Sequence, residues 1–273
     1  QFDIVLLLMK AYDSRWSAQL IEPYLKPDGL IAGVQNGMTT NTIADVVGAH
    51  RTIGCVIEIY SAMFTPGIVT RDSPHDRSWF AVGSIDPSTR GREHEVADLL
   101  RHAGKADIVE NIQAAKWMKL VSNATTLVST AVLGVSIHEG AAIPEMRDLM
   151  LRSGQEALDT GAALGHPVQP IFGLKPEDIQ QSNRLVDKLL ETLLSGFTLP
   201  STRTTVLQDW MKGRHSEVDD LNGLVAGEAK RMGKRAPVNE AITTLAHRIE
   251  RGELKPGLAN LALLRQLTRD SSA

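Results

Sequence analysis

The chain of 273 residues lacks most of the short motifs that reveal a function directly. No two of its 22 glycines are separated by a single residue, so even the first half of a Gly-x-Gly-x-x-Gly dinucleotide turn is absent. A Gly-x-x-x-x-Gly-Lys-Ser/Thr phosphate loop and a Gly-x-Ser-x-Gly nucleophile elbow are absent as well. The eight histidines are scattered, with no His-Glu-x-x-His pair, and we therefore expect no metal site.

Composition excludes further classes of protein. The single cysteine, Cys55, rules out an internal disulfide framework and fits a reducing cytosol. A net charge of -3 and an isoelectric point near 6.3 give no electrostatic basis for binding nucleic acid or an anionic membrane. No apolar run approaches the roughly 20 residues that a membrane span needs. We therefore expect a cytoplasmic protein that binds neither nucleic acid nor membrane.

The two halves of the chain differ in the secondary structure that their sequence patterns predict. The first half alternates short apolar strands with short helices, which is typical of an α/β nucleotide-binding domain. From Asn111 onward the strand signals vanish and long helical patterns follow, with glycines at their ends. The predicted strands are 2–9, 30–34, 52–59, 67–71, 78–85 and 107–110, and the predicted helices are 14–25, 39–47, 89–103, 111–133, 141–164, 175–195, 203–230 and 237–251. We therefore predict an α/β domain over 1–109 and an all-helical domain over 110–273.

The first strand is unusual because it starts the chain. Gln1 is followed at once by the apolar run 2–9, a pattern typical of a strand buried on both faces in the middle of a parallel sheet. A central strand with no partner before it predicts that the first part of the domain precedes this sequence. The segment 26–29, Lys-Pro-Asp-Gly, predicts a turn before the next strand.

The sharpest candidate site is a lysine and an asparagine one helical turn apart. Lys119 and Asn123 are at positions i and i+4, which project from the same face of a helix, so both can reach one small polar ligand. Apolar neighbours surround the pair, and a partly buried lysine needs a partner. Such a pair suits protonation or polarisation of a carbonyl oxygen. The alternative is an ordinary solvated helix face.

Four other polar residues are candidates. Asn36 and Lys10 each follow a predicted strand, at the edge where open α/β sheets bind ligands, although Asn36 also fits an Asn-Gly turn and Lys10 a surface lysine. Glu217 is a candidate partner for a lysine ammonium. The alternative is an acidic residue in the first turn of a helix, where Ser216 would form a capping box. Thr205 offers a hydroxyl to a carboxylate, or is a capping or strand threonine.

Taken together, these segments resemble the ketopantoate reductase (2-dehydropantoate 2-reductase) family. The similarity runs from about residue 2 to about residue 262. It rests on five motifs in the family's order, which are Lys10-Ala11, Gln35-Asn36-Gly37-Met38, Trp117-Met118-Lys119 with Asn123, Leu207-Gln208-Asp209 and Glu217-Val218-Asp219-Asp220-Leu221-Asn222-Gly223. The resemblance implies a Rossmann-type NADP-binding domain joined to a helical domain like that of 6-phosphogluconate dehydrogenase.

The resemblance also implies a reaction, the NADPH-dependent reduction of ketopantoate to pantoate on the route to pantothenate and coenzyme A. In that reaction Lys119 would be the general acid, and Glu217 would orient and charge-pair it while facing the cofactor. Asn36 and Lys10 would contact cofactor and substrate near the nicotinamide. Asn123 would bind the substrate hydroxyl, and Thr205 would stand where the family has a serine that binds the substrate carboxylate.

Three departures from the family pattern matter. The glycine-rich phosphate turn is absent together with the first two βαβ units, roughly 60–70 residues at about 30 residues per unit. Leu127 replaces a second asparagine, for which Thr126 is the nearest compensating side chain, and Thr205 replaces the serine. The last two changes question ketopantoate as the substrate more than they question the reaction class.

Two rival functions remain open. One is a non-catalytic short homologue that serves as a dimerisation or carboxylate-binding module, and the other is a related hydroxyacid dehydrogenase with a different substrate. Because the phosphate turn is absent, we expect these 273 residues alone to bind NADPH far more weakly than an intact reductase does and to give no measurable turnover. A homodimer is compatible with either enzyme hypothesis.

Overall fold

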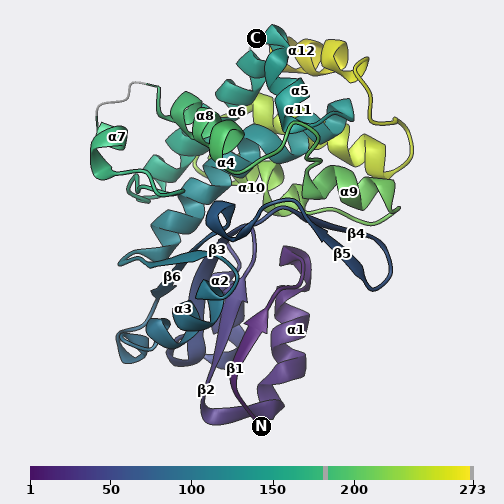
Figure 1. Ribbon diagram of the computed structural model, residues 1–273. Coiled ribbons are helices and arrows are strands. Elements are labelled where there is room, and N and C mark those ends of the chain that lie inside the picture. Colours follow the sequence, from purple (N-terminus) through teal and green to yellow (C-terminus); the bar gives the residue numbers. More distant parts are fainter. Residues whose placement is uncertain (181–183, 271–273) are drawn as a thin grey trace. The chain divides into compact units, whose positions relative to one another are not determined.

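The computed structural model describes residues 1–180 and 184–270 of the chain (Figure 1). The chain divides into two compact units. Unit 1 comprises Gln1–Ile59, Ser73–Lys119 and His166–Gln180, and unit 2 comprises Tyr60–Asp72, Leu120–Gly165 and Gln181–Ala273. Unit 1 carries an α/β sheet and the elements after residue 111 are helices, so the predicted fold class is confirmed. The simple division at residue 109/110 stays a prediction.

A mixed five-stranded sheet forms the centre of unit 1, in the order β1-β2-β3-β6-β7. Its strands are β1 (Phe2–Leu7), β2 (Leu25–Val34), β3 (Thr52–Glu58), β6 (Trp79–Ser84) and β7 (Lys105–Ile108). The first three are parallel, β6 runs antiparallel to β3, and β7 is parallel to β6. The carboxyl ends of β1, β2 and β3 therefore meet at one edge of the sheet, and those of β6 and β7 at the opposite edge.

Helices cover both faces of this sheet. Successive residues of a strand point to opposite faces, so β2 presents Leu30, Ala32 and Val34 to one core and Ile31 to the other. The helices are α1 (Ser14–Ile21), α2 (Thr40–Val47) and α3 (Glu93–Arg101). Helix α3 packs on the first core, and α1 and α2 pack on the second. The strands are apolar on both faces because neither face meets water.

Strand β1 is the edge strand of the described sheet, and Phe2 and Asp3 are exposed. Its expected central place in a larger sheet stays a prediction, whereas the turn predicted over 26–29 needs correction. The predicted turn over 26–29 lies inside strand β2 as an irregularity. Phe2 pairs with Leu25 and Ile4 with Leu30, so β2 has more residues than β1 between these two pairs. Turn residues are what such a bulge requires.

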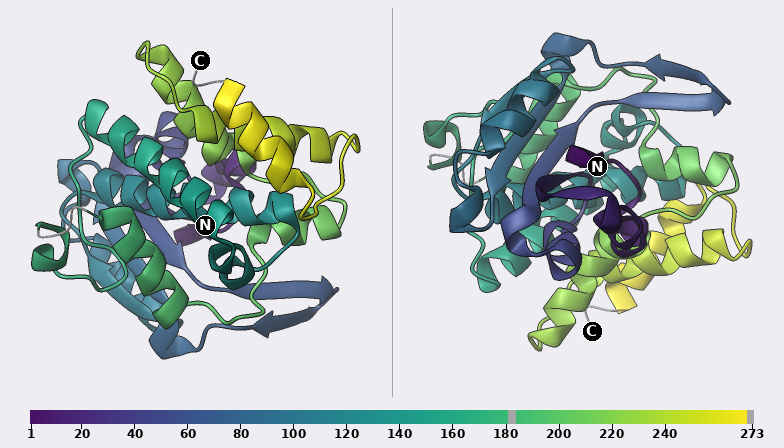
Figure 2. Two further views of the ribbon diagram at one scale, coloured as in Figure 1. Left: turned by 90° about the horizontal axis from the view of Figure 1, so that it is seen from above. Right: turned by 90° about the horizontal axis from the view of Figure 1, so that it is seen from below.

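One long helix, α4 (Ile112–Leu133), begins in unit 1 and continues into unit 2. Every residue from Ala114 to Leu133 is buried, and a helix that is apolar nearly all round belongs in a core. The other helices are α5 (Ile137–Ala142), α6 (Pro144–Ala163), α7 (Pro176–Gln180), α8 (Leu185–Gly196), α9 (Thr205–Met211), α10 (Asn222–Arg231), α11 (Pro237–Glu250) and α12 (Asn260–Asp270), of which α7 belongs to unit 1 (Figure 2). Unit 2 also contains a hairpin of β4 (Ser61–Thr65) and β5 (Ile68–Arg71).

Buried side chains of unit 2 bind the backbone of α4. Asn222 and Ser153 both donate to the carbonyl of Ala124, at 3.1 and 3.0 Å, and Asn222 also donates to Asn239 at 2.8 Å. Thr204 donates to the Leu127 carbonyl at 3.0 Å. Buried polar groups of this kind are tolerated only when they are hydrogen-bonded, so these contacts fix the position of α4 within the unit.

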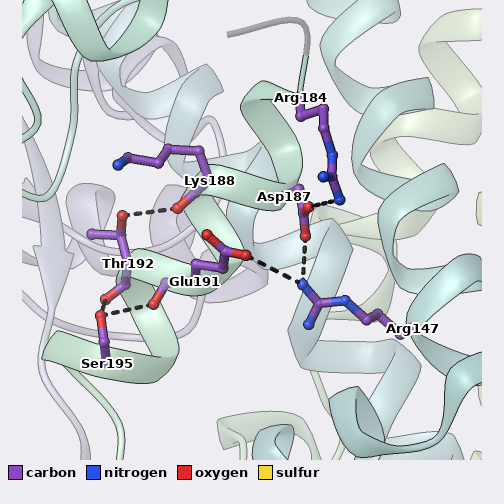
Figure 3. Close-up of polar contacts among 7 residues, drawn as sticks. All are labelled: Arg147, Arg184, Asp187, Lys188, Glu191, Thr192 and Ser195. Atoms are coloured by element: carbon purple, nitrogen blue, oxygen red, sulfur yellow. Dashed lines mark hydrogen bonds and ion pairs between the residues drawn. The ribbon is translucent and has the colours of Figure 1, made fainter.

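Ion pairs connect helix α8 to helix α6, as Figure 3 shows. The carboxylate of Asp187 is buried. One of its oxygens accepts a 2.5 Å hydrogen bond from Arg147 of α6, and the other pairs with Arg184. Arg147 also lies 3.8 Å from Glu191, one turn further along α8. A carboxylate that is nearly buried between two guanidinium groups satisfies both of its oxygens.

The longest predicted helices are interrupted. The prediction over 203–230 is wrong between Lys212 and Leu221, where the chain turns at Gly213 and forms only a short 3-10 turn, Val218–Asp220. The prediction over 175–195 corresponds to α7 and α8, and its residues 181–183 lie outside the described part of the chain. The sequence reading missed β4 and the C-terminal helix α12.

The tight packing of β6 against the start of α4 predicts a glycine requirement. A Cβ atom at Gly83 would stand 2.7 Å from the Val109 carbonyl and 2.8 Å from the Ile112 Cβ, so we expect Gly83→Ala to destabilise the protein by about 1–3 kcal/mol. Gly227, inside α10, has open space around it and is the control. Gly227→Ala should stabilise by up to about 1 kcal/mol. Urea unfolding of both variants checks the pair, and equal effects would contradict the packing argument.

Candidate active site

Polar residues gather where β1 and β2 end in unit 1. Lys10 follows β1 in extended backbone geometry and Asn36 follows β2, and both are partly buried. Gly37 has a φ of 71°, a left-handed conformation that glycine adopts without strain, so the chain turns directly after Asn36. Strand ends of a parallel sheet are where ligands bind in open α/β folds. The predicted positions of Lys10 and Asn36 at this edge are confirmed.

The ammonium of Lys119 forms a buried ion pair with Glu58. Lys119 is 6% exposed and Glu58, the last residue of β3, is 2% exposed. Taking two charges out of water is costly unless they pair closely, and here each one supplies the counter-charge of the other. The sequence reading expected a carboxylate partner for Lys119 but did not identify Glu58.

Aromatic rings complete the surroundings of Lys119. The Phe172 ring centroid lies 5.3 Å from the Lys119 Nζ, within the range of a cation–π contact, and the Trp79 ring meets Phe172 edge-on at 5.8 Å. Trp79 is also the residue opposite Glu58 in the β3–β6 ladder. Phe172 has a φ of 60°, which is rare for a residue with a side chain and is often found at functional sites. Lys119, Glu58, Trp79 and Phe172 thus form a closed cluster.

A second buried lysine lies one turn before Lys119. Lys116 is 2% exposed, and its ammonium donates to the carbonyls of Gln35 and Cys55 at 3.1 and 3.0 Å. Burial raises the pKa of the Cys55 thiol to about 12, although the charge of Lys116 opposes the shift. Cys55 is therefore a protonated, inert core residue. The Cys55 thiol therefore does not act as a nucleophile, although it lies beside Lys116.

Three of the predicted substrate residues belong to unit 2. Asn123 is 1% exposed and follows Lys119 by one turn of α4. Thr126 is also buried, and its hydroxyl donates to the Ser122 carbonyl at 2.9 Å, which leaves it only an acceptor for a ligand. Thr205 is half-buried at the first residue of α9, where Thr204 rather than Thr205 caps the helix. Their binding roles stay predictions.

Glu217 is buried in unit 2, at 4% exposure. The capping-box alternative for it is wrong, because the Ser216 hydroxyl donates instead to Glu250 at 2.6 Å and Glu217 makes no side-chain cap of the short turn that follows. Burial, together with the charges of Glu217 and Asp219, raises the pKa of Asp220 to about 6. The pairing of Glu217 with Lys119 stays a prediction.

A large cleft in unit 1 lies elsewhere. It has a volume of about 1270 Å³ and is lined at the carboxyl ends of β6 and β7 by residues such as Ser84, Asp86 and Glu110. No predicted site residue lines it. Within residues 1–180 and 184–270 there is no group of three or more histidine, cysteine, aspartate or glutamate side chains that could hold a metal ion. Across that same part of the chain, no helix is long and apolar enough to cross a membrane.

The ion pair balances the charge of the cluster, and the proton-donor role of Lys119 stays a prediction. An ammonium in an apolar, aromatic setting interacts strongly with negative charge that develops nearby, because little water screens it. Sequence reasoning identified Lys119 from its spacing to Asn123. It missed Glu58, Lys116 and Phe172, and of these only Lys116 carried a local signal, since it falls inside the same apolar helix.

Comparison with known proteins places these features in a family context. Residues 1–84 match the family model described as ketopantoate reductase PanE/ApbA, and residues 111–250 match the model of its C-terminal part. The 2-dehydropantoate 2-reductase of Archaeoglobus fulgidus is 24% identical over 256 residues, which cover 92% of this chain and 77% of that protein. That of Streptococcus pyogenes serotype M1 is 25% identical over 249 residues, covering 90% and 75%.

Solved structures show the same relationship. The 2-dehydropantoate 2-reductase of Geobacter metallireducens GS-15 superposes with a TM-score of 0.74 at 25% identity, over 90% of this chain and 77% of that one. A D-mandelate dehydrogenase bound to NADH and anilino(oxo)acetate superposes with a TM-score of 0.79 at 19% identity, over 92% and 77%. The second likeness shows a common fold.

The Lys119–Glu58 pair predicts strong coupling between its members. Glu58→Gln leaves a buried ammonium unpaired and Lys119→Met leaves a buried carboxylate unpaired, so each should cost about 3–5 kcal/mol of unfolding free energy. The double variant should cost much less than the sum. Lys26→Met, which breaks the exposed Asp3–Lys26 pair of the same unit, is the control and should cost at most about 1 kcal/mol. Single variants no worse than this control would contradict the buried pair.

The raised pKa of Asp220 predicts a stability that depends on pH. The folded chain binds this proton more tightly than the unfolded chain, so the contribution is full below about pH 4 and is lost as pH rises through about 6. Asp220→Asn should therefore raise the melting temperature relative to wild type at pH 8 and leave it little changed at pH 4. Thermal unfolding at both pH values measures this. A gain for Asp220→Asn that is the same at both would exclude titration as its cause.

Proposed function

This chain belongs to the ketopantoate reductase family, and we propose that it reduces a 2-oxo acid, most specifically ketopantoate to pantoate, with NADPH as the reductant. It is an oxidoreductase of that family and uses a nicotinamide cofactor. The single observation that carries the proposal is the buried ammonium of Lys119, charge-balanced by Glu58 and faced by an aromatic ring.

The chemistry follows from the charge that the reaction creates. A reduced nicotinamide, when bound, would supply a hydride to the carbonyl carbon of the 2-oxo acid. Negative charge then develops on the former carbonyl oxygen, and Lys119 stabilises it and donates a proton to it. Because the ammonium is buried, it has little water to reorganise as that charge forms. Glu58 keeps the lysine side chain in place and compensates its charge before substrate binds.

The residues at the ends of β1 and β2 fit the nicotinamide end of a cofactor. Lys10 and Asn36 place a cationic and an amide donor at this edge, and Gly37 allows close approach of a ligand to the backbone. Thr39 lies two residues after Gly37, and its buried hydroxyl has no hydrogen-bond partner among the described residues. A buried polar atom in that condition suits a polar ligand. The glycine-rich turn for the pyrophosphate is not among these 273 residues.

Substrate recognition falls to the unit 2 residues in this proposal. Asn123 would hold the hydroxyl of the substrate and Thr205 its carboxylate, while Glu217 would support Lys119 and the cofactor. Thr126 would serve only as an acceptor, because its proton is engaged with Ser122. This engagement, with Leu127 in place of an asparagine, favours a second candidate function, the reduction of another 2-oxo acid. A panel of 2-oxo acids distinguishes the two.

Replacement of Lys119 tests the reaction. In the product of the full reading frame that contains this chain, Lys119→Ala should lower kcat about 10²–10³-fold, because it removes a donor used mainly in the transition state. KM should change less. Lys188→Ala, at an exposed position of α8, is the control and should keep wild-type kinetics. Steady-state oxidation of NADPH with ketopantoate measures both. A Lys119→Ala enzyme with nearly full kcat would exclude the general-acid role.

A further inference from the structure

Side chains continue the connection between parallel strands after their backbone pairing has ended. The last pair of the β1–β2 ladder is Leu7 with Gly33, and the last pair of the β2–β3 ladder is Val34 with Cys55. Beyond such pairs the backbones of parallel strands have no further ladder bonds to hold them together. Lys10 and Asn36 lie in this region, so something other than the ladder must fix them.

Gln35 connects the end of β2 to the end of β1. Its side chain is 4% exposed, and its amide nitrogen donates to the Met9 carbonyl at 2.6 Å and to the Ser14 hydroxyl at 3.0 Å. Ser14 in turn donates to the Ala11 carbonyl at 2.7 Å. The segment from Met9 to Ser14, which contains Lys10, is thereby held at both ends by one glutamine.

Lys116 connects the end of β2 to Cys55, the last residue of β3 that pairs with β2. Its ammonium donates to the Gln35 carbonyl at 3.1 Å and to the Cys55 carbonyl at 3.0 Å, from a helix that crosses the same edge of the sheet within unit 1. Gln35 therefore binds Lys116 through its backbone and Met9 through its side chain. Together the two residues join the ends of β1 and β2 to the middle of β3 in one buried network.

We propose that Lys116 and Gln35 are positioning residues that hold Lys10 and Asn36 in place for ligand binding. Asn36 is placed between the fixed Gln35 and the left-handed turn at Gly37, and Lys10 directly follows the fixed Met9. What is positioned, a nicotinamide cofactor, rests on the proposed function. The network itself rests only on the hydrogen bonds of unit 1.

The chemistry of Lys116 separates positioning from stability. Burial of an ammonium is costly, and an apolar side chain of the same length would avoid that cost. The hydrogen bonds of Lys116, however, are what connect the strands. Removal of the ammonium should therefore loosen this region locally, whereas loss of an ordinary core residue would destabilise the whole unit.

Hydrogen exchange of the 273-residue chain tests the network directly. In Lys116→Met, amides of 34–39 should exchange about tenfold faster or more, while amides in the rest of the sheet change much less. In Gln35→Leu, the faster exchange should fall on 8–14. Lys188→Met makes the same chemical change at an exposed helix position and should alter neither segment. Unchanged exchange in both Lys116→Met and Gln35→Leu, or a lowered melting temperature with uniformly faster exchange, would overturn the proposal.

Kinetics of the full-reading-frame product add a functional measurement. Lys116→Met should raise the KM for NADPH about tenfold and change kcat less than about threefold, because the pocket is loosened while the proton donor remains. A fall in kcat at unchanged KM would instead indicate loss of folded enzyme and contradict positioning. If the wild-type protein reduces no 2-oxo acid, the proposed function fails, whereas the exchange pattern alone still supports or overturns the network.

Discussion

A buried ammonium must have acceptors, and this requirement fixes the helix α4 against the sheet of unit 1. Lys116 and Lys119 are both buried, three residues apart on that helix, and their acceptors lie just after β2 and within β3. Moving the helix by one residue would remove the acceptors of both charges at once, at a cost of several kcal/mol for each. The register of α4 on the sheet is therefore set by polar contacts as much as by apolar packing. The proton donor of the proposed reaction is held by the same contacts that hold the fold.

The fold was largely predictable because its core follows simple periodicities. Strands such as β3 and β6 read as short apolar runs, and α4 reads as one long buried helix, because burial on all sides leaves a continuous apolar pattern. One failure has a physical reason. The helical pattern over 203–230 continues through Lys212 to Leu221, yet the chain leaves the helix there at Gly213, whose φ is 65°.

The candidate site was predictable only where its residues are close in sequence. Lys119 and Asn123 share a helix, so their spacing alone indicates a common face. Glu58 could not be found in this way, because the contact depends on β3 ending beside α4, and 61 positions separate the two residues. Phe172 lies in a loop, and its positive φ has no signature in a sequence. The sequence suggested Glu217 as a counter-charge, a pairing that stays a prediction, and the geometry of unit 1 provides one from Glu58.

The polar residues of α4 divide into two groups by where their partners lie. Four hydroxyl residues donate to the carbonyl four positions earlier in the same helix, which satisfies them without any outside partner: Thr125, Thr126, Ser129 and Thr130. Lys116 and Lys119 cannot do this, because an ammonium on a long side chain reaches beyond its own helix. A buried helix thus tolerates serine and threonine as nearly apolar residues, while each buried lysine must be matched by a built acceptor elsewhere. By this criterion Thr126 belongs to the helix interior, and it replaces an asparagine side chain only in part, since its one donor is already used.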